Sequence, residues 1–416
     1  MTSFKRQLLD EVVCPHCWNK FPPENALWIA ESSELVGDAK LGDAARMRFL
    51  PTEFSAQGFP VDARGCECRE FACPNCHLRV PYSSLETPSI YLSCAGAPGS
   101  GKTYYLTSST WFMRRVARLF QYAYSDADPE MNRKVHEYEA RQFLGDPERL
   151  VELEKTESQG ELYDQVRFDG ALVSYPRPFV FSLSPLTPTK RSEEDDDSRS
   201  DSRLVYMYDN AGESFLPNAN ADSSVAPVTR HLGQSDCIFF LYDPTQDSRF
   251  GDNFGKDPAR DDSYLNRSPT RQDAVLLETI RRVRAERRMY ATERYRGALV
   301  VVATKVDAWK NLIPNAHDLD SDPIETQKIG KRDYSFLRLD LIKSMSARVR
   351  SLFLERAPEV VLAAESFAGD VIYIPVSASG VAPSYDAETK RRGFRPKDMK
   401  PLWIVAPTLY GFSFSH

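Results

Sequence analysis

The sequence feature that most constrains the fold is a glycine-rich loop set between an apolar segment and an amphipathic one. The loop consists of Gly96, Ala97, Pro98, Gly99, Ser100, Gly101, Lys102 and Thr103. It fits the pattern of glycine, four residues, glycine, lysine and then serine or threonine, in which backbone N–H groups, the lysine and the hydroxyl surround phosphate oxygens and Mg²⁺. Residues 89–95 predict a buried strand before the loop, and residues 104–120 predict a helix after it. This context predicts a nucleotide-binding loop at the positive end of a helix.

Segments after the loop alternate between apolar strands and amphipathic helices. Strands are predicted at residues 177–183, 204–209, 236–242, 298–303 and 371–376, and helices at 272–290 and 337–356. Several of these strands are apolar on both faces, as in parallel sheets that are covered on both sides. The fold class is therefore predicted as α/β, with a mostly parallel sheet and helices on both of its faces.

Three further segments are predicted around this core. A polar helical insert covers about residues 121–165 and contains two short amphipathic helices, at 133–143 and 149–154. An acidic run within about residues 187–203 is predicted to be the disordered tip of a hairpin, without a chemical role. The apolar segment 401–410 is predicted to dock on the core.

Composition limits the compartment and the partners. With 416 residues, 42% of them hydrophobic, the chain is long enough for one large domain and one small one. Its formal charge of −6 argues against a main role on nucleic acid or at a membrane surface. Residues 1–10 lack the apolar core of a signal peptide, and no apolar run approaches the ~20 residues of a membrane-spanning helix. We therefore expect a cytoplasmic protein, and we expect neither a membrane nor nucleic acid as its partner.

A repeated cysteine pattern near the N-terminus predicts a structural zinc site. Two Cys-x-x-Cys turns with similar flanking residues supply the cysteines Cys14, Cys17, Cys73 and Cys76. Two such turns can aim four thiolates at one point, which closes a tetrahedral zinc site and resembles a zinc ribbon. We assign residues 1–86 to this ribbon with its long insertion, and residues 87–416 to the nucleotide-binding domain.

Two further cysteines, Cys66 and Cys68, have several possible roles. They complete a second metal site with His16 or His77, they replace one of the four zinc ligands, or they are ordinary thiols near the ribbon. We favour the last interpretation, because four ligands already close a structural site.

Three short motifs follow the glycine-rich loop in order, each at the predicted carboxyl end of a strand. They are Asp209-x-x-Gly212, Thr304-Lys305-x-Asp307 and Ser377-Ala378-Ser379. Each motif alone is common. Ligands of open α/β sheets bind at the carboxyl ends of the strands, so the order and placement of the three motifs together indicate a ligand-binding site. Over residues 89–379 the chain resembles the Ras-like P-loop GTPase superfamily, which carries this series. The cysteine pattern and the long insertions also resemble the zinc-ribbon-bearing double-GTPase proteins of bacterial conflict and defence systems.

The resemblance implies roles at the phosphate end of the site. Lys102 and the loop backbone would hold the β- and γ-phosphates of GTP. Thr103 and Asp209 would hold Mg²⁺, the latter through water. The N–H of Gly212 would sense the γ-phosphate, and Glu213 stands where many relatives have a glutamine that orients the attacking water.

At the base end, the resemblance implies that Asp307 accepts two hydrogen bonds from guanine. Lys305 would lie along the base, and the N–H of Ala378 would meet the guanine oxygen. Thr304 and Ser377 belong to the same nucleotide-binding segments. A carboxylate suits the adjacent N–H donors of guanine, whereas adenine offers no such pair.

Two departures from the family pattern bear on hydrolysis. The Glu213 carboxylate can accept a hydrogen bond from water but cannot donate one to the γ-phosphate, so we expect hydrolysis that is slow, uses other groups or needs a partner. The span from Gly96 to Asp209 is also longer than a minimal domain needs. The switch threonine, a further Mg²⁺ ligand, is therefore not placed. Thr156 is the candidate, although T-x-x-E pairs also arise as helix caps.

Two functional classes compete. In the first, the protein is a GTP-hydrolysing switch that controls a partner protein, which the family analogy suggests is a second GTPase or an effector. In the second, it is a P-loop ATPase or a nucleotide-gated scaffold with a zinc-ribbon interaction module. The ordered motifs favour the first class. A nucleic-acid-binding ribbon protein with a vestigial loop is a distant third.

Overall fold

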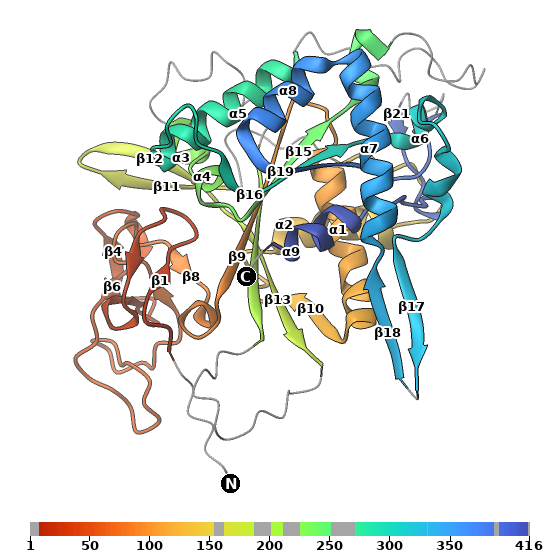
Figure 1. Cartoon of the computed structure of the whole chain (residues 1–416). Helices are drawn as coiled ribbons and strands as arrows, with labels where there is room; N and C mark the ends of the chain where they lie inside the picture. Colours follow the sequence, from red (N-terminus) through yellow and green to blue (C-terminus); the bar gives the residue numbers. More distant parts are fainter. Residues whose placement is uncertain are drawn as a thin grey trace.

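A seven-stranded β-sheet lies at the centre of the molecule and determines where the candidate site lies (Figure 1). The computed structural model describes residues 8–153, 162–186, 201–210, 225–250, 271–330, 332–386 and 391–414. In spatial order the strands are β10 (Tyr122–Asp126), β13 (Phe179–Pro185), β14 (Arg203–Asp209), β9 (Ser89–Gly96), β15 (Cys237–Tyr242), β16 (Tyr295–Ala303) and β19 (Ala368–Pro375). The five strands from β14 to β19 are parallel, whereas β13 pairs antiparallel with β14, and β10 pairs antiparallel with β13. The prediction of an α/β fold with a mostly parallel sheet is confirmed.

The strand order reverses at β9, which is the first strand of this sheet in the chain. After β9, the chain forms β10, β13 and β14 on one side and then β15, β16 and β19 on the other. In an open parallel sheet such a reversal marks the ligand-binding crevice, outside the carboxyl ends of the strands. The residues that follow Gly96, Asp209, Tyr242, Ala303 and Pro375 therefore share one edge of the sheet.

Helices cover both faces of the sheet (Figure 1). On one face, α1 (Lys102–Val116) packs against β15, where the rings of Tyr105 and Phe239 are 5.9 Å apart. On the other face, α7 (Leu339–Arg356) packs against the same strand, where the rings of Phe353 and Tyr242 are 4.9 Å apart. Successive side chains of a strand point to opposite faces, so Phe239 and Tyr242, three residues apart, contact different layers.

The remaining elements surround this core. The helices are α2 (Arg133–Glu139), α3 (Val225–Val228), α4 (His231–Gln234), α5 (Gln272–Arg287), α6 (Val306–Trp309), α8 (Pro358–Phe367) and α9 (Ala406–Phe412). The hairpins are β11 (Tyr163–Phe168) with β12 (Ala171–Pro176), β17 (Ile324–Ile329) with β18 (Arg332–Leu337), and β20 (Ser384–Asp386) with β21 (Arg391–Gly393). Among the residues described, no helix has both the length and the apolar character needed to cross a membrane.

The N-terminal module, residues 8–86, is built from short strands and packs against the large sheet. Its strands are β1 (Val12–Val13), β2 (Lys20–Phe21), β3 (Leu27–Ile29), β4 (Val36–Asp38), β5 (Gly42–Arg46), β6 (Arg48–Phe49), β7 (Phe71–Ala72) and β8 (Arg79–Val80). Its apolar core includes Val166 and Tyr175 of the β11–β12 hairpin. The Trp18 ring contacts Tyr91 of β9, with ring centroids 4.8 Å apart, and Tyr208 of β14, at 5.7 Å. The buried Tyr208 hydroxyl donates a hydrogen bond to the carbonyl oxygen of Pro15 at 2.6 Å.

Parts of the predicted insert take a different structure. The helix expected at 149–154 is wrong over its described part, because Val151 forms an isolated β-bridge with Phe394. The first helix exists as α2, followed by a π-helical turn, η4 (Ala140–Leu144), and the insert also contributes edge strand β10. The acidic tip falls mainly on residues 187–200, outside the described residues.

The C-terminal segment docks on the core as predicted. Trp403, Ile404 and Tyr410 are buried in the main hydrophobic cluster. Gly411 of α9 lies so close to β15 that an added Cβ would stand 3.3 Å from the Phe239 ring. The division of the chain at residue 86 stays a prediction.

We predict that Tyr208→Phe lowers the free energy of unfolding by about 1–2 kcal/mol, because it leaves the buried Pro15 carbonyl without its donor. Urea unfolding measures this change. Tyr290→Phe is the matched control, since the Tyr290 side chain is 76% exposed. Equal stabilities for the two variants would mean that this contact does not stabilise the junction between module and sheet.

Candidate functional site

Four buried cysteines of the N-terminal module converge on one point. The sulfur atoms of Cys14, Cys17, Cys73 and Cys76 all lie within 4.8 Å of one another. Cys14 Sγ is 3.7 Å from Cys76 Sγ, and Cys17 Sγ is 3.7 Å from Cys73 Sγ. A tetrahedral zinc ion with Zn–S bonds of about 2.3 Å would separate its sulfurs by about 3.8 Å. The spacing therefore suits a structural metal such as zinc.

The two turns that carry these cysteines have the same backbone geometry. Trp18 and His77 follow the second cysteine of each turn, and both have a left-handed backbone, with φ of 64° and 62°. Their N–H groups donate to the carbonyl oxygens of Cys14 and Cys73, at 3.0 and 2.9 Å. This repeated turn is what lets two sequence-distant segments aim their thiolates at the same point.

Donors around the sulfurs favour the thiolate form that binds metal. The His16 N–H is 3.4 Å from Cys14 Sγ, and the side-chain amide of Asn75 is 3.4 Å from Cys17 Sγ. Burial raises the pKa of the Cys14 and Cys76 thiols. Without a cation, ionising all four buried thiols would be costly, whereas a bound zinc ion would offset that cost.

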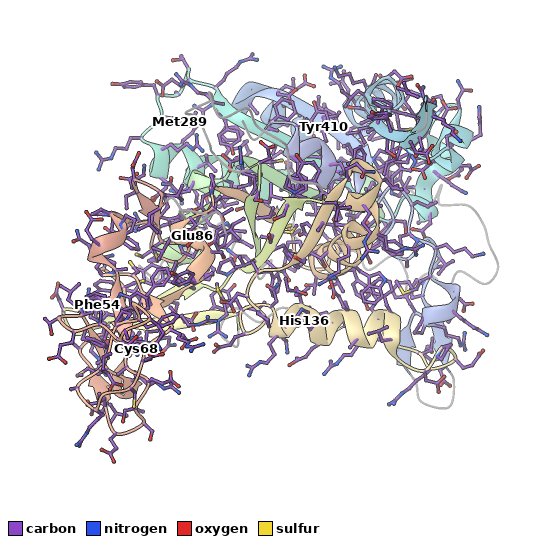
Figure 2. The ribbon with its side chains drawn as sticks, turned by 90° about the horizontal axis from the view of Figure 1, so that it is seen from below. Phe54, Cys68, Glu86, His136, Met289 and Tyr410 are labelled. Atoms are coloured by element: carbon purple, nitrogen blue, oxygen red, sulfur yellow. The ribbon has the colours of Figure 1, made fainter. Side chains whose placement is uncertain are left out.

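Cys66 and Cys68 lie apart from this cluster. Figure 2 shows Cys68 near Phe54, in the outer loops of the N-terminal module. The Asp62 carboxylate organises this region by accepting hydrogen bonds from the backbone N–H groups of Ser32 and Cys66, at 3.0 Å each. Within the described ranges, the metal-compatible cluster consists of the other four cysteines alone. The interpretation of Cys66 and Cys68 as ordinary thiols stays a prediction.

At the edge of the large sheet, the glycine-rich loop connects β9 to α1. Its glycines are required by backbone geometry: Gly99 and Gly101 have φ of 74° and 91°, and a Cβ on Gly96 would stand 2.7 Å from the Leu241 carbonyl oxygen. Lys102 is the first residue of α1 and is buried. Its Nζ donates to the carbonyl oxygens of Gly96 and Ala97, at 2.9 Å each, so the loop curls around the ammonium group.

Side chains at the carboxyl ends of two other strands of the sheet, β14 and β16, contact this loop. The Thr103 hydroxyl donates to Asp209 Oδ2 at 3.0 Å, at the carboxyl end of β14. The Thr304 hydroxyl, just after β16, donates to the Ser100 carbonyl oxygen at 2.9 Å. Lys305 has a left-handed backbone, with φ of 55°, and its Nζ reaches the Gly99 carbonyl oxygen at 3.3 Å.

The other base-end residues lie on the same edge. Asp307 is half-buried in the first turn of α6, the helix that begins immediately after Lys305. Ser377 and Ala378 follow β19, and the Ala378 carbonyl oxygen accepts a hydrogen bond from Ser108 of α1 at 3.1 Å. The structure thus brings together all the predicted site segments that it describes. Three further candidates, Thr156, Gly212 and Glu213, lie outside the described residues.

Two residues at this edge were missed by the sequence analysis. Asp243 directly follows β15, and its Oδ2 is 2.5 Å from Lys305 Nζ. Gln246 lies against the loop, with its Nε2 2.9 Å from where a Cβ on Gly99 would stand. The available signal was positional, because the predicted strand 236–242 ends at the same edge as its parallel neighbours.

A buried polar network fixes the residue after Asp209. The Asn210 side-chain amide donates to the Val228 carbonyl oxygen at 2.9 Å and is 2.7 Å from His231 Nε2. The other ring nitrogen, Nδ1, lies 2.6 Å from the Ser93 hydroxyl. Burial lowers the pKa of His231 to about 3, so the ring is neutral near pH 7. Ser93, His231 and Asn210 are all fully buried, so this serine–histidine–asparagine arrangement is part of the packed interior.

Comparisons with known proteins give no family assignment. No protein-family model matches the chain, and no curated protein matches it. Among solved structures, a protein from Thermus thermophilus is similar at 10% identity with a TM-score of 0.22, over 70% of this chain. The chain spans 38% of the length of that protein. A likeness this weak supports no conclusion about fold or function.

We predict that Cys73→Ser lowers both the bound zinc and the thermal stability of the protein, because three thiolates leave a structural site open. Elemental analysis of the purified protein and thermal unfolding measure the two effects. Cys66→Ser is the matched control, since it also removes one thiol of the same module. Full zinc content in Cys73→Ser, with zinc loss in Cys66→Ser, would move the site to the outer loops.

Proposed function

We propose that this protein is a GTP-binding and GTP-hydrolysing switch that controls a partner protein. The observation that carries the proposal is the meeting of four sequence-distant segments at one sheet edge: the glycine-rich loop, Asp209, residues 304–307 and residues 377–378. The glycine-rich loop contacts Asp209 through Thr103, and it contacts Thr304 and Lys305 through its own carbonyl oxygens. This edge lies at the reversal of the strand order, where nucleotides bind in open α/β sheets.

The phosphate end of this edge is suited to a polyphosphate. Backbone N–H groups at the start of α1 and the Lys102 ammonium supply positive charge. Lys102 would exchange its contacts with the Gly96 and Ala97 carbonyl oxygens for phosphate oxygens. The Thr103 hydroxyl and the Asp209 carboxylate are hard oxygen ligands of the kind that Mg²⁺ prefers, and the ion would neutralise phosphate charge.

Base recognition is assigned to the segments after β16 and β19. Asp307 would accept hydrogen bonds from guanine, Lys305 would lie along the ring, and the Ala378 N–H would donate to the guanine oxygen. Lys305 is already held in place between Asp243 and the Gly99 carbonyl oxygen. Because the Lys305 side chain is already ordered, its ordering adds less to the entropic cost of nucleotide binding.

Hydrolysis would depend on the segment after Asp209. Glu213 would orient the attacking water and Gly212 would sense the γ-phosphate, with Thr156 as a further ligand of Mg²⁺. A carboxylate beside a polyanion is a poor substitute for a glutamine, so we propose slow turnover or activation by a partner.

The zinc-binding module and its partner complete the proposal. We assign the four-cysteine module to protein interaction, with a second GTPase or an effector as partner and bacterial defence as the setting, on the family resemblance alone. The competing function is an ATPase or nucleotide-gated scaffold. One observation favours it: Asp307 lies in the first turn of α6, where a carboxylate also stabilises the helix through its dipole.

We predict that Asp307→Asn weakens GTP binding by about 2–5 kcal/mol and gains binding of xanthosine triphosphate. The asparagine amide keeps one acceptor and adds a donor, which matches the extra carbonyl of xanthine. Competition binding with GTP, ATP and xanthosine triphosphate in the presence of Mg²⁺ measures the change.

The matched control is Asp320→Asn, which removes the same charge from an exposed position nearby. GTP preference in the parent protein together with a switch in Asp307→Asn supports the proposal. Equal affinity of the parent protein for GTP and ATP would instead assign it to the competing class.

A further inference from the structure

The segment 377–380, which we call the base loop, is held on one side by the C-terminal chain. Ser377 and Leu402 exchange two backbone hydrogen bonds, of 3.1 and 2.9 Å. The Lys400 N–H donates to the Ser379 carbonyl oxygen at 2.7 Å. Gly380 has φ of 72°, and a Cβ on it would collide with the Lys400 carbonyl oxygen. These contacts fix the outer side of the base loop.

On its inner side, the base loop is held by a serine of α1. The Ser108 hydroxyl donates to the Ala378 carbonyl oxygen at 3.1 Å. Ser108 is fully buried, whereas Ala378 is half-buried between the two buried serines Ser377 and Ser379. The Ser108 contact therefore restrains the residue whose N–H we assign to the guanine oxygen.

A glutamine of the helical insert sets the direction of the Ser108 hydrogen bond. The Gln142 side-chain N–H donates to Ser108 Oγ at 2.8 Å, and Gln142 is 2% exposed. Because this N–H can only donate, the Ser108 oxygen is the acceptor, and its own hydrogen remains available for the Ala378 carbonyl oxygen. Gln142, Ser108 and Ala378 thus form a chain of hydrogen bonds in which each group donates to the next, from the insert to the base loop.

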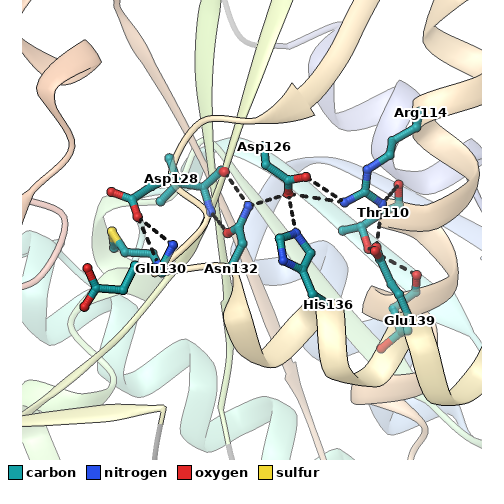
Figure 3. A network of polar contacts seen from close by, with 11 residues as sticks. Thr110, Arg114, Asp126, Asp128, Glu130, Asn132, His136 and Glu139 are labelled. Atoms are coloured by element: carbon teal, nitrogen blue, oxygen red, sulfur yellow. Dashed lines mark hydrogen bonds and ion pairs between the residues drawn. The ribbon is translucent and has the colours of Figure 1, made fainter.

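Gln142 reaches Ser108 because charged contacts fix the insert on α1 (Figure 3). Glu139 accepts hydrogen bonds from the Thr110 hydroxyl at 2.8 Å and from Arg114 at 2.6 Å. Arg114 also donates to Asp126 of β10 at 3.2 Å. Gln142 lies three residues after Glu139, in the π-helical turn η4, and such turns often occur at functional sites.

We infer that Ser108 and Gln142 are positioning residues for base recognition, and that the insert orients the base loop. This inference deepens the proposed function and rests on it. Without the Ser108 hydroxyl, the Ala378 carbonyl loses its inner restraint. The Ala378 N–H lies on the adjacent peptide group and is joined to that carbonyl through the same Cα, so a rotation of the backbone at Ala378 would align the N–H less well with the base. The phosphate contacts of Lys102 and Thr103 do not involve Ser108.

The test measures the affinities of the full-length protein for GTP and for ATP with Mg²⁺. Ser108→Ala is expected to lower GTP affinity about five- to tenfold, as for the loss of one buried hydrogen bond, and to leave ATP affinity unchanged. Gln142→Glu is expected to act in the same way, because a carboxylate accepts the Ser108 hydrogen and withdraws it from Ala378.

Ser109→Ala is the matched control. Ser109 is the next residue of α1, is also fully buried, and bonds to Thr408 of α9 at 2.8 Å. Its loss perturbs the same helix without touching the base loop, so the preference for GTP over ATP should not change. A Ser108→Thr variant, which keeps the hydroxyl, should retain that preference.

The outcomes distinguish the positioning role of Ser108 and Gln142 from the proposed GTPase function. If the parent protein prefers GTP and neither Ser108→Ala nor Gln142→Glu changes that preference, the positioning role is wrong and the GTPase proposal stands. If Ser108→Ala lowers GTP and ATP affinity equally, or Ser109→Ala has the same effect, Ser108 only supports the helix and the inference is also wrong. Equal affinity of the parent protein for both nucleotides overturns the proposed function and the inference together.

Discussion

Backbone hydrogen bonds between β9 and its parallel neighbours, β14 and β15, are the constraint on which the candidate site depends. Asp209 pairs with Cys94, and Leu241 pairs with Gly96, so the loop after β9 begins between the ends of its two flanking strands. Thr103 can then reach Asp209 with a short side chain. A shift of one residue in either pairing would turn each side chain to the opposite face and separate these groups.

The sequence was informative where neighbouring residues determine the structure and uninformative where distant residues do. The glycine-rich loop, the strand at 298–303 and the cysteine pairs each carry a local pattern with a local physical cause. The contacts of Ser108 with Gln142 and Ala378 join residues separated by 34 and 270 positions, and no local pattern encodes them. At residues 149–153 the apolar spacing was compatible with a helix, but Val151 instead forms an isolated β-bridge with Phe394, far along the chain. Helix propensity is weak and tertiary contacts can override it.

The four-cysteine cluster and the sheet edge are parts of one packed unit. Trp18 follows the second cysteine of its turn and contacts both β9 and β14, while Tyr208, the neighbour of Asp209, donates to Pro15 within that turn. Close-packed interiors deform little and transmit displacement. We therefore expect a displacement of the turn that carries Cys14 and Cys17 to displace β14, the strand that ends in Asp209.

The hairpin that completes the core of the N-terminal module has a consequence for biosynthesis. Val166 and Tyr175 belong to that core, yet they follow all four cysteines in the chain. Tyr175 leaves the ribosome about 100 residues after Cys76, which at typical rates of synthesis is roughly 5–20 seconds later. During that interval the four cysteines have emerged, but the part of their apolar core that the hairpin supplies has not. If the cluster holds a structural metal, its early capture would protect these thiols from oxidation, and the metal supply during synthesis would then affect the yield of folded protein.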